Sequence, residues 1–425
     1  MRVSALLVAL AAGARAGVAQ GVPMTLQQAI DHALAVQPAV VQARGTLTNA
    51  EWQKRAALGA FLPTLTAAAG AFTVNQQSVV NGLFVQPGIY QYNSSLTSNL
   101  DVFTGFGRIA EYRNATANEH AANAALVNQR YQVIVATQQA FFAVLADQDL
   151  VRVADAQVGR TKEELQTALN KFAAGAATRS DTLTSTVDLG NAKFTLLQAQ
   201  ANLATAEANL ARQVGSDGLV EAVGDSALPP LPDTTALRAS AAGNAPTVVQ
   251  AEADARAASA ALGVARAQWW PTLSASYATS SQGLTEPWNG FGGGNRNLNQ
   301  LRIGLSWTLF NGFAREQAIA QSSAALDYAQ AQAADTRRQF DALFTQDATA
   351  LFAANAQIDV ASANVAAATE ALRVQQERYR VGAGTLLDLE TAEANLTQAE
   401  ANQVQARYNY VVARAQLEAL VGRSL

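Results

Sequence analysis

Apolar residues recur every seven positions along much of the second half of the chain. The positions are Phe344, Leu351, Ile358, Val365, Leu372 and Tyr379. From Leu389 to Leu420, mostly Leu and Ala residues then recur at alternating steps of three and four. Such repeats are typical of α-helices that pack as left-handed coiled coils. They predict two long helices, at about 312–379 and 385–422.

The first half of the chain carries the same pattern 207 positions earlier. The corresponding positions are Thr137, Val144, Val151, Val158, Leu165 and Phe172, most of them apolar. Proline placement agrees, because none lies between Pro87 and Pro229 or after Pro287, and proline disrupts helix interiors. Two further long helices are therefore predicted, at about 104–172 and 178–215.

Shorter segments alternate apolar and polar residues with a period of two. The clearest are Asn299–Phe310 and Tyr90–Val102. The weaker partners are Thr64–Val74 and Thr272–Thr279. Alternation over about ten residues is typical of transmembrane β-strands with apolar side chains outward, but a half-buried soluble sheet gives the same pattern. The sequence thus predicts two β-hairpins, at about 64–103 and 271–310.

Two hairpins supply four strands per chain, joined by outer loops at Gln76–Gly88 and Gln282–Leu298. Open sheet edges are not tolerated in lipid, and single-chain barrels start at about eight strands. If these strands enter a membrane, several chains must therefore share one barrel.

Landmarks in one register indicate a tandem repeat. Residues 38–43 (PAVVQA) match residues 246–251 (PTVVQA) at an offset of 208, and residues 102–108 (VFTGFGR) match residues 309–315 (LFNGFAR) at an offset of 207. Gly215 corresponds in the same way to Gly422. The chain thus consists of two related halves.

The predicted organisation begins with a secretory signal peptide at 1–19, with Arg2 before a short apolar segment and small residues at the cleavage site. No other stretch is apolar enough for a transmembrane helix. The remaining parts are a first repeat at 20–216, a proline-containing linker at 217–245 and a second repeat at 246–425.

The composition excludes most catalytic and metal-binding chemistry. The chain has no Cys and two His, His32 and His120, which lack partners at metal-ligand spacing. We expect both histidines to face solvent. A net charge of −4 gives no electrostatic footprint for nucleic acid. No nucleotide-binding or hydrolase motif occurs. We therefore predict no enzyme activity, cofactor, metal site or nucleic-acid partner.

These features together resemble the TolC-type outer-membrane efflux protein family over essentially the whole mature chain. The most specific match is residues 379–389 (YRVGAGTLLDL), followed by residues 406–410 (ARYNY). Residues 25–30 (TLQQAI) and 309–312 (LFNG) agree as well. One departure is Gly384, which stands where the TolC gate has an Arg.

The resemblance implies a mainly helical homotrimer. Four strands from each chain would form a shared twelve-strand β-barrel in the cell outer membrane, in contact with its lipid. A long α-helical coiled-coil barrel would continue into the periplasm. The implied function is a passive, gated exit duct for drugs or other exported solutes. It would work with a periplasmic adaptor (membrane fusion) protein and an inner-membrane pump of RND, ABC or MFS type.

Two other functions remain open from the sequence. One is the exit duct of a type I polypeptide secretion system. The other is a periplasmic coiled-coil adaptor or scaffold without a pore. The exported substrate, the class of pump and the resting state of the gate are not encoded in a recognisable motif.

The resemblance also implies roles for residues near the helix–helix turns. Asp388 aligns with an acidic ring at the periplasmic entrance, and Tyr379 with Asp181 aligns with a gate pair. The spacing Thr385-x-x-Asp388 and Thr178-x-x-Asp181 also predicts helix capping boxes. Either Glu390 or Glu393 could add to the acidic constriction.

The turns themselves contain Gly175, Val381 and Gly382. Glycine there suits a helix C-terminus with positive φ, and the resemblance adds contact with the periplasmic adaptor. On the strands, Arg302 and Asp101 fall on polar positions and are candidates for lining the pore, although Arg302 could equally lie at a membrane interface.

Overall fold

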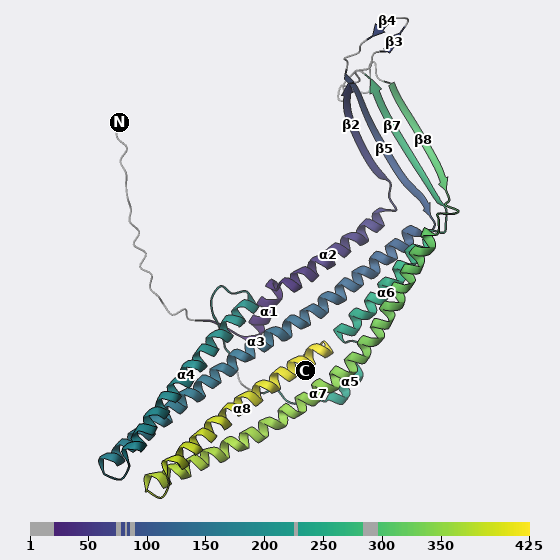
Figure 1. Ribbon diagram of the computed structural model, residues 1–425. Helices are drawn as coiled ribbons and strands as arrows, with labels where there is room; N and C mark the ends of the chain where they lie inside the picture. Colours follow the sequence, from purple (N-terminus) through teal and green to yellow (C-terminus); the bar gives the residue numbers. More distant parts are fainter. Residues whose placement is uncertain (1–20, 74–77, 81–82, 86–89, 225–227, 284–295) are drawn as a thin grey trace, which may run out of the picture. The chain divides into compact units, whose positions relative to one another are not determined.

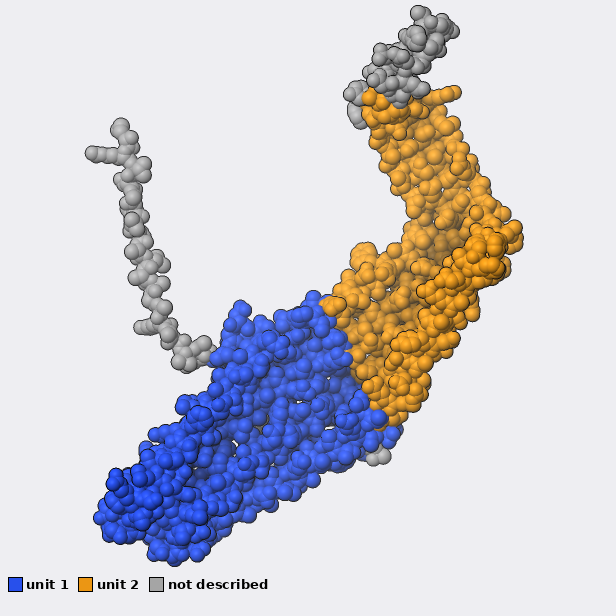
Figure 2. Space-filling model, viewed as in Figure 1, with its two compact units in different colours: residues 1–41, 129–241, 342–425 blue, residues 42–128, 242–341 orange. Residues whose placement is uncertain are grey.

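A computed structural model describes residues 21–73, 78–80, 83–85, 90–224, 228–283 and 296–425. The predicted signal peptide, residues 1–19, and parts of the predicted loops 76–88 and 282–298 lie outside these residues. The chain forms two compact units (Figure 2). Unit 1 comprises residues 1–41, 129–241 and 342–425, and unit 2 comprises residues 42–128 and 242–341.

Helices dominate the described residues and occur as matched pairs (Figure 1). The bounds are α2 Pro38–Gly59 and α6 Pro246–Ala267, of 22 residues each; α3 Gly107–Ala173 and α7 Ala314–Arg380, of 67 each; and α4 Arg179–Val214 and α8 Leu386–Val421, of 36 each. These equal lengths reflect the repeat in the sequence. No helix in the described part of the chain is long and apolar enough to cross a membrane.

Unit 1 contains two helical hairpins. One pairs the C-terminal part of α3 with α4, and the other pairs the C-terminal part of α7 with α8. Phe141 and Val144 of α3 pack against Leu210 and Val214 of α4 in one buried cluster. This cluster also receives α1 (Leu26–Val36) and the parallel strands β1 (Val22–Met24) and β6 (Val220–Ala222). Leu372 and Tyr379 of α7 pack against three residues of α8, namely Leu389, Ala392 and Leu396. The short helix α5 (Thr234–Ala241) also belongs to unit 1.

Unit 2 contains a four-stranded antiparallel sheet of order β2-β5-β7-β8. The strands are β2 Thr64–Thr73, β5 Tyr90–Thr104, β7 Thr272–Gly283 and β8 Arg296–Ser306. The two predicted hairpins are thus joined through β5 and β7, which leaves β2 and β8 at the edges. Beyond the sheet, β3 (Ser78–Val80) pairs with β4 (Leu83–Val85).

The strand register separates the two faces of this sheet. Leu301 pairs with Tyr277, and Leu305 pairs with Leu273, which itself pairs with Phe103. Because paired residues point to the same face, these apolar side chains share one face. Most of that face is exposed in the single chain, with Leu305 at 72%. The sheet therefore needs a partner or an apolar environment to cover this face.

The opposite face is polar. Arg302 pairs with Ser276, which pairs with Asn99, which pairs with Thr64. Along this row a guanidinium group, a hydroxyl group, an amide group and a second hydroxyl group lie side by side. The register therefore separates apolar and polar faces as the alternating sequence predicts.

Aromatic residues gather where the strands meet the helices of unit 2. The ring of Phe103 lies edge-on to Phe106, which lies edge-on to Trp270, and Phe310 lies edge-on to Phe313. Phe106 and Phe313 have φ of 65° and 67°, each directly after a glycine that is also left-handed. These sharp turns change the chain from strand to helix at equivalent places in both repeats.

Candidate functional site

The candidate site lies at the two helix–helix turns of unit 1. Gly175 and Gly382 have φ of 75° and 78°, as predicted for helix C-termini. In the first turn, Ala176 N donates to Lys171 O at 2.8 Å and Gly175 N donates to Phe172 O at 3.0 Å. The second turn repeats both bonds from Ala383 and Gly382. These paired bonds form Schellman motifs, so each hairpin ends in a tight, well-defined turn.

Asp181 and Asp388 cap the helices that follow the turns, as predicted. The Asp388 carboxylate accepts hydrogen bonds from Thr385 N at 3.1 Å and Thr385 Oγ1 at 2.8 Å. Asp181 accepts from Thr178 N at 2.8 Å. The two bonds from Thr385 lower the pKa of the exposed Asp388 carboxyl. Asp388 therefore stays ionised well into the acid range.

Tyr379 is held by Lys171 of the other hairpin. The Lys171 ammonium donates to the Tyr379 carbonyl oxygen and lies 3.7 Å from the centre of the Tyr379 ring. Burial lowers the pKa of Lys171. Because Lys171 is on α3 and Tyr379 is on α7, this contact joins the two hairpins at their tips. Sequence reasoning missed Lys171, which occupies the place of Arg378 in the repeat.

Tyr379 and Asp181, the expected gate pair, are not hydrogen-bonded to each other. Tyr379 is only 7% exposed, and its Oη has no hydrogen-bond partner among the described residues. Burial, followed by the nearby charge of Asp181, raises the pKa of Tyr379. The two residues are therefore close enough to interact electrostatically, while the Asp181 carboxylate is engaged by Thr178.

A layer of four acidic residues lies next to Tyr379, between α3, α4 and α8. The layer comprises Glu164, Asp188, Glu390 and Glu393. Glu164 and Glu393 are each 6% exposed, and their carboxyl groups are within hydrogen-bonding reach of each other. Burial and the charge of Glu393 raise the pKa of Glu164 to about 8. Burial also raises the pKa values of Glu390 and Glu393.

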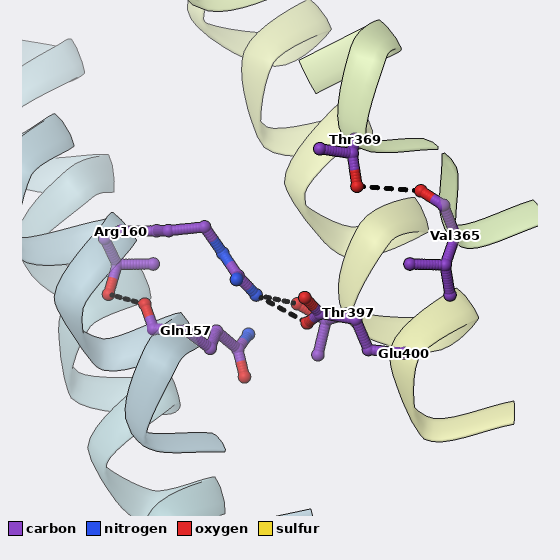
Figure 3. A network of polar contacts seen from close by, with 7 residues as sticks. Gln157, Arg160, Val365, Thr369, Thr397 and Glu400 are labelled. Carbon is purple, nitrogen blue, oxygen red and sulfur yellow. Dashed lines mark hydrogen bonds and ion pairs between the residues drawn. The ribbon is translucent and has the colours of Figure 1, made fainter. Parts of the chain in front are cut away.

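An ion pair lies near the acidic layer (Figure 3). Arg160 Nη2 of α3 donates to Glu400 Oε2 at 3.1 Å and to Thr397 Oγ1 at 3.2 Å, both on α8. The Arg160 side chain is 17% exposed and that of Glu400 is 23% exposed. Together with Lys171 and Glu164, Arg160 forms a line of polar contacts that connects the two hairpins.

The sequence contains a signal for this line of polar contacts between the hairpins. Gln157, Glu164 and Lys171 stand at seven-residue steps along α3, so they lie on one stripe of a coiled-coil helix. Gln157 lines a groove with residues of α4 and α8. Polar residues at heptad spacing thus mark the side of α3 that faces the second hairpin.

The remaining predicted residues lie apart from this line. Val381 is 64% exposed at the turn, as an adaptor-contacting position requires. Arg302 and Asp101 lie on the polar face of the sheet in unit 2, where Arg302 pairs with Ser276 and Asp101 with Ser274.

Neither histidine approaches a ligand site. His32 and His120 are exposed, as predicted. Within the described ranges, no group of His, Cys, Asp or Glu side chains has the geometry to hold a metal ion. The site therefore consists of capping carboxylates, inter-hairpin contacts and a buried acidic layer.

Comparison with known proteins identifies relatives of the whole fold. The sequence profile of a family described as outer membrane efflux protein matches residues 29–216 and 237–423, once in each repeat. The cobalt-zinc-cadmium resistance protein CzcC of Cupriavidus metallidurans is 27% identical over 221 residues, which are 51% of this chain and 50% of CzcC. The aligned region therefore spans about half the length of that relative.

Solved structures share the fold at low sequence identity. The outer membrane protein VceC of Vibrio cholerae superposes with a TM-score of 0.77 at 20% identity, covering 94% of this chain and 96% of VceC. The CmeC outer membrane channel of Campylobacter jejuni gives 0.80 at 16% identity, covering 93% and 85%. The open state of the Neisseria gonorrhoeae MtrE outer membrane channel gives 0.76 at 19%, covering 94% and 89%.

Proposed function

Because this chain belongs to the outer membrane efflux protein family, we propose that it forms the passive, gated exit duct of a tripartite export system. The protein resides in the outer membrane, and its structural relatives are channels rather than enzymes. In the proposed function, a periplasmic adaptor docks on the helix tips and an inner-membrane pump supplies the energy. The signal peptide at residues 1–19 directs export of the chain.

The observation that carries this proposal is the four-stranded sheet. Its edge strands β2 and β8 each pair with one strand in the described structure, and one of its faces is apolar and exposed. Unpaired backbone groups are costly in lipid. Three copies that join β8 of one chain to β2 of the next would satisfy both edges and turn the apolar faces outward. Arg302 and Asp101 would then line the lumen.

The gate is formed by the hairpin tips. Lys171 and Arg160 connect the α3–α4 hairpin to α7 and α8, and Tyr379 lies close enough to Asp181 to interact electrostatically with it. Opening separates the hairpins and breaks these contacts. Three copies of Asp388 form an acidic ring at the entrance, which attracts cations. Gly175, Val381 and Gly382 form the tip surface to which the adaptor binds.

Divalent metal cations are the first cargo to test. The relative CzcC is named a cobalt-zinc-cadmium resistance protein, and an acidic entrance suits cations. A host strain that lacks this gene should become sensitive to cobalt, zinc or cadmium and recover when the gene is restored. Sensitivity to drugs alone would assign the duct to drug export. Loss of a secreted polypeptide alone would assign it to type I secretion.

Conductance tests the duct itself. The purified protein should give small, cation-preferring single-channel openings in a planar bilayer. Since the chain contains no Cys, cysteine pairs can test the edge contact in the intact protein. One cysteine at Thr66 of β2, combined in turn with successive positions of β8, should yield a cross-linked trimer in outer membranes. Absence of both conductance and trimer would favour the pore-free scaffold.

A further inference from the structure

We propose that Glu164 and Glu393 form a proton-binding site that holds the two hairpins together and makes gate opening sensitive to pH. This inference rests on the proposed function, since it assigns regulation to the same gate. Glu164 belongs to α3 and Glu393 to α8. A proton shared between them is therefore a direct link between the hairpins that must separate when the duct opens.

The buried geometry requires this proton. Glu164 and Glu393 are each 94% shielded from solvent, given their 6% exposure, and their carboxyl groups are within hydrogen-bonding reach. Two ionised carboxylates at such a distance repel each other in a poorly solvated interior. One protonated carboxyl can instead donate a hydrogen bond to the other. The proton thus converts a repulsive pair into an attractive one.

The neighbouring helices surround the pair with further charged and titratable groups. Asp188 of α4 and Glu390 of α8 lie close and add negative charge, while Asp181 of α4 adds more from the turn. Arg160 of α3 is the nearby cation, and it lowers the pKa of Glu393, but its guanidinium is bonded to Glu400. Lys171 is bonded to Tyr379. Arg160 therefore favours the ionised form of Glu393, while burial and the neighbouring carboxylates raise the pKa of Glu164 to about 8.

A buried hydroxyl adds to this argument. Tyr379 of α7 is 7% exposed, and its Oη has no hydrogen-bond partner among the described residues. Tyr379 lies close enough to Glu164 and Glu390 to interact electrostatically with them. A buried hydroxyl without a partner is costly, and it becomes a useful donor once a carboxylate beside it ionises. The layer thus offers an alternative arrangement for the deprotonated state.

The buried carboxyl groups occur in only one of the two equivalent places of the sequence repeat. At the equivalent positions 207 residues away, Glu164 corresponds to Ala371 and Glu393 to Thr186. Helix pairing in this fold therefore does not need carboxyl groups at these places. Since buried carboxyl groups weaken a helix interface unless they are protonated or paired, their presence on one side only fits a regulatory role.

The direction of the effect follows from the raised pKa. A carboxyl that holds its proton more tightly when folded stabilises the closed joint at acid pH, and this contribution disappears as pH rises through the folded pKa. The window runs from the ordinary value of 4.5 to about 8. Within this window the closed joint loses at most about tenfold in stability per pH unit, and the loss levels off above pH 8. The gate is therefore expected to open more readily as pH rises toward about 8.

Glu164→Gln tests the site because glutamine mimics the protonated carboxyl at every pH. Glu163→Gln is the matched control, since Glu163 is the exposed neighbour on the same helix. In planar bilayers, wild type and Glu163→Gln should show open probability that rises between pH 5 and pH 8 by about tenfold per unit at most and levels off above pH 8. Glu164→Gln should stay at the low-pH level. An unchanged pH profile in Glu164→Gln would overturn the proposal.

Two further measurements separate this site from the channel function. The infrared carbonyl band of a protonated carboxyl should be present at pH 7 in wild type and lost in Glu164→Gln. The melting temperature should fall as pH rises from 4.5 to 8 in wild type and in Glu163→Gln, but not in Glu164→Gln. If these signatures appear while no variant conducts, the proton site stands and the duct function fails. If wild type conducts and the signatures are absent, the duct function stands and the proton site fails.

Discussion

Lys171 of α3 donates a hydrogen bond to the backbone carbonyl of Tyr379 on α7, and its ammonium lies 3.7 Å from the centre of the tyrosine ring. The two residues belong to different helical hairpins. Lys171→Met should therefore loosen the tips, because it removes a charge-assisted hydrogen bond and a cation–π contact that together contribute about 2–3 kcal/mol.

We expect Lys171→Met to increase the frequency and size of single-channel openings. Lys162→Met is the control, since Lys162 is an exposed lysine of the same helix and its loss should leave the openings unchanged. Equal effects of both substitutions would show that net charge, rather than the contact with Tyr379, controls opening.

Asp388→Asn should reduce cation selectivity while preserving the fold. An asparagine oxygen can still accept the hydrogen bond from Thr385 N, but the negative charge at the entrance is gone. Glu163→Gln is the control, because it removes an exposed negative charge from α3 without touching either helix cap. The measurement is the K⁺/Cl⁻ permeability ratio from reversal potentials. An unchanged ratio in Asp388→Asn would rule out the acidic ring.

The pKa of Asp388 adds a pH test of its own. Its hydrogen bonds from Thr385 lower that pKa below the ordinary aspartate value of 3.8. The capping contribution to stability is therefore present above pH 3.8 and is lost as pH falls through the lower folded value. Cation selectivity should accordingly persist at pH 5.

The sequence predicts the packed side of α8 well, because an apolar stripe at coiled-coil spacing supplies most of its buried residues. The predicted positions that are buried in the structure are Leu389, Ala392, Leu396, Ala399, Ala406, Tyr410, Ala413 and Leu417. The mainly helical, TolC-like fold class that the family resemblance implies is confirmed by the structural relatives.

The same reasoning fails in the lower part of α3. The heptad transferred from α7 puts Phe172 on the packed side, yet Phe172 is 46% exposed, while Thr161 and Glu164 are buried. Periodicity assigns faces by hydrophobicity, so a carboxyl group that is buried against another hairpin looks like a solvent-facing residue. The polar heptad of Gln157, Glu164 and Lys171 marks this side of α3, but the carboxyl partner of Glu164 on α8 is seen only in the structure.

The sheet shows a second limit of prediction from the sequence. Strict alternation along β5 places Val102 with Leu100 on the apolar face. The structure has an irregularity between Asp101 and Phe103, after which Phe103 takes the apolar position opposite Leu273. A bulge of this kind inserts one residue and resets the alternation, and nothing in the local sequence marks it.

Gly105→Ala should destabilise the protein more than Gly312→Ala. Both glycines have left-handed backbones, with φ of 61° and 66°, so alanine costs about 1–2 kcal/mol at either place. At Gly105 an added Cβ would also lie 2.9 Å from the Ala267 carbonyl oxygen and against Trp270, whereas nothing lies within 4 Å at Gly312. The overpacking adds about 1–3 kcal/mol.

Thermal unfolding of the two glycine variants gives a direct comparison within one molecule. Gly105→Ala should show the larger drop in melting temperature. Similar drops would mean that the contact with Trp270 relaxes freely.

Arg160→Met should weaken the joint between the hairpins. The bonds of Arg160 to Glu400 and Thr397 are largely shielded from water, so the expected loss is about 1–3 kcal/mol, between the values for surface and buried ion pairs. Arg152→Met is the control on the same helix. The Arg152 side chain is 78% exposed, and its loss should cost less than about 0.5 kcal/mol. Denaturant unfolding of both variants measures the difference.

Ile303→Lys should block assembly in the outer membrane, because Ile303 is 69% exposed on the apolar face of the sheet. A lysine on a lipid-facing strand position costs about 2–4 kcal/mol near the middle of the bilayer, and a trimer would carry this cost three times. Arg302→Gln changes the next residue along β8, on the polar face, and should leave assembly intact while altering conductance. Heat-sensitive migration of membrane-extracted trimers on gels distinguishes assembled from unassembled protein. Normal assembly of Ile303→Lys would mean that this face is covered by protein instead of lipid.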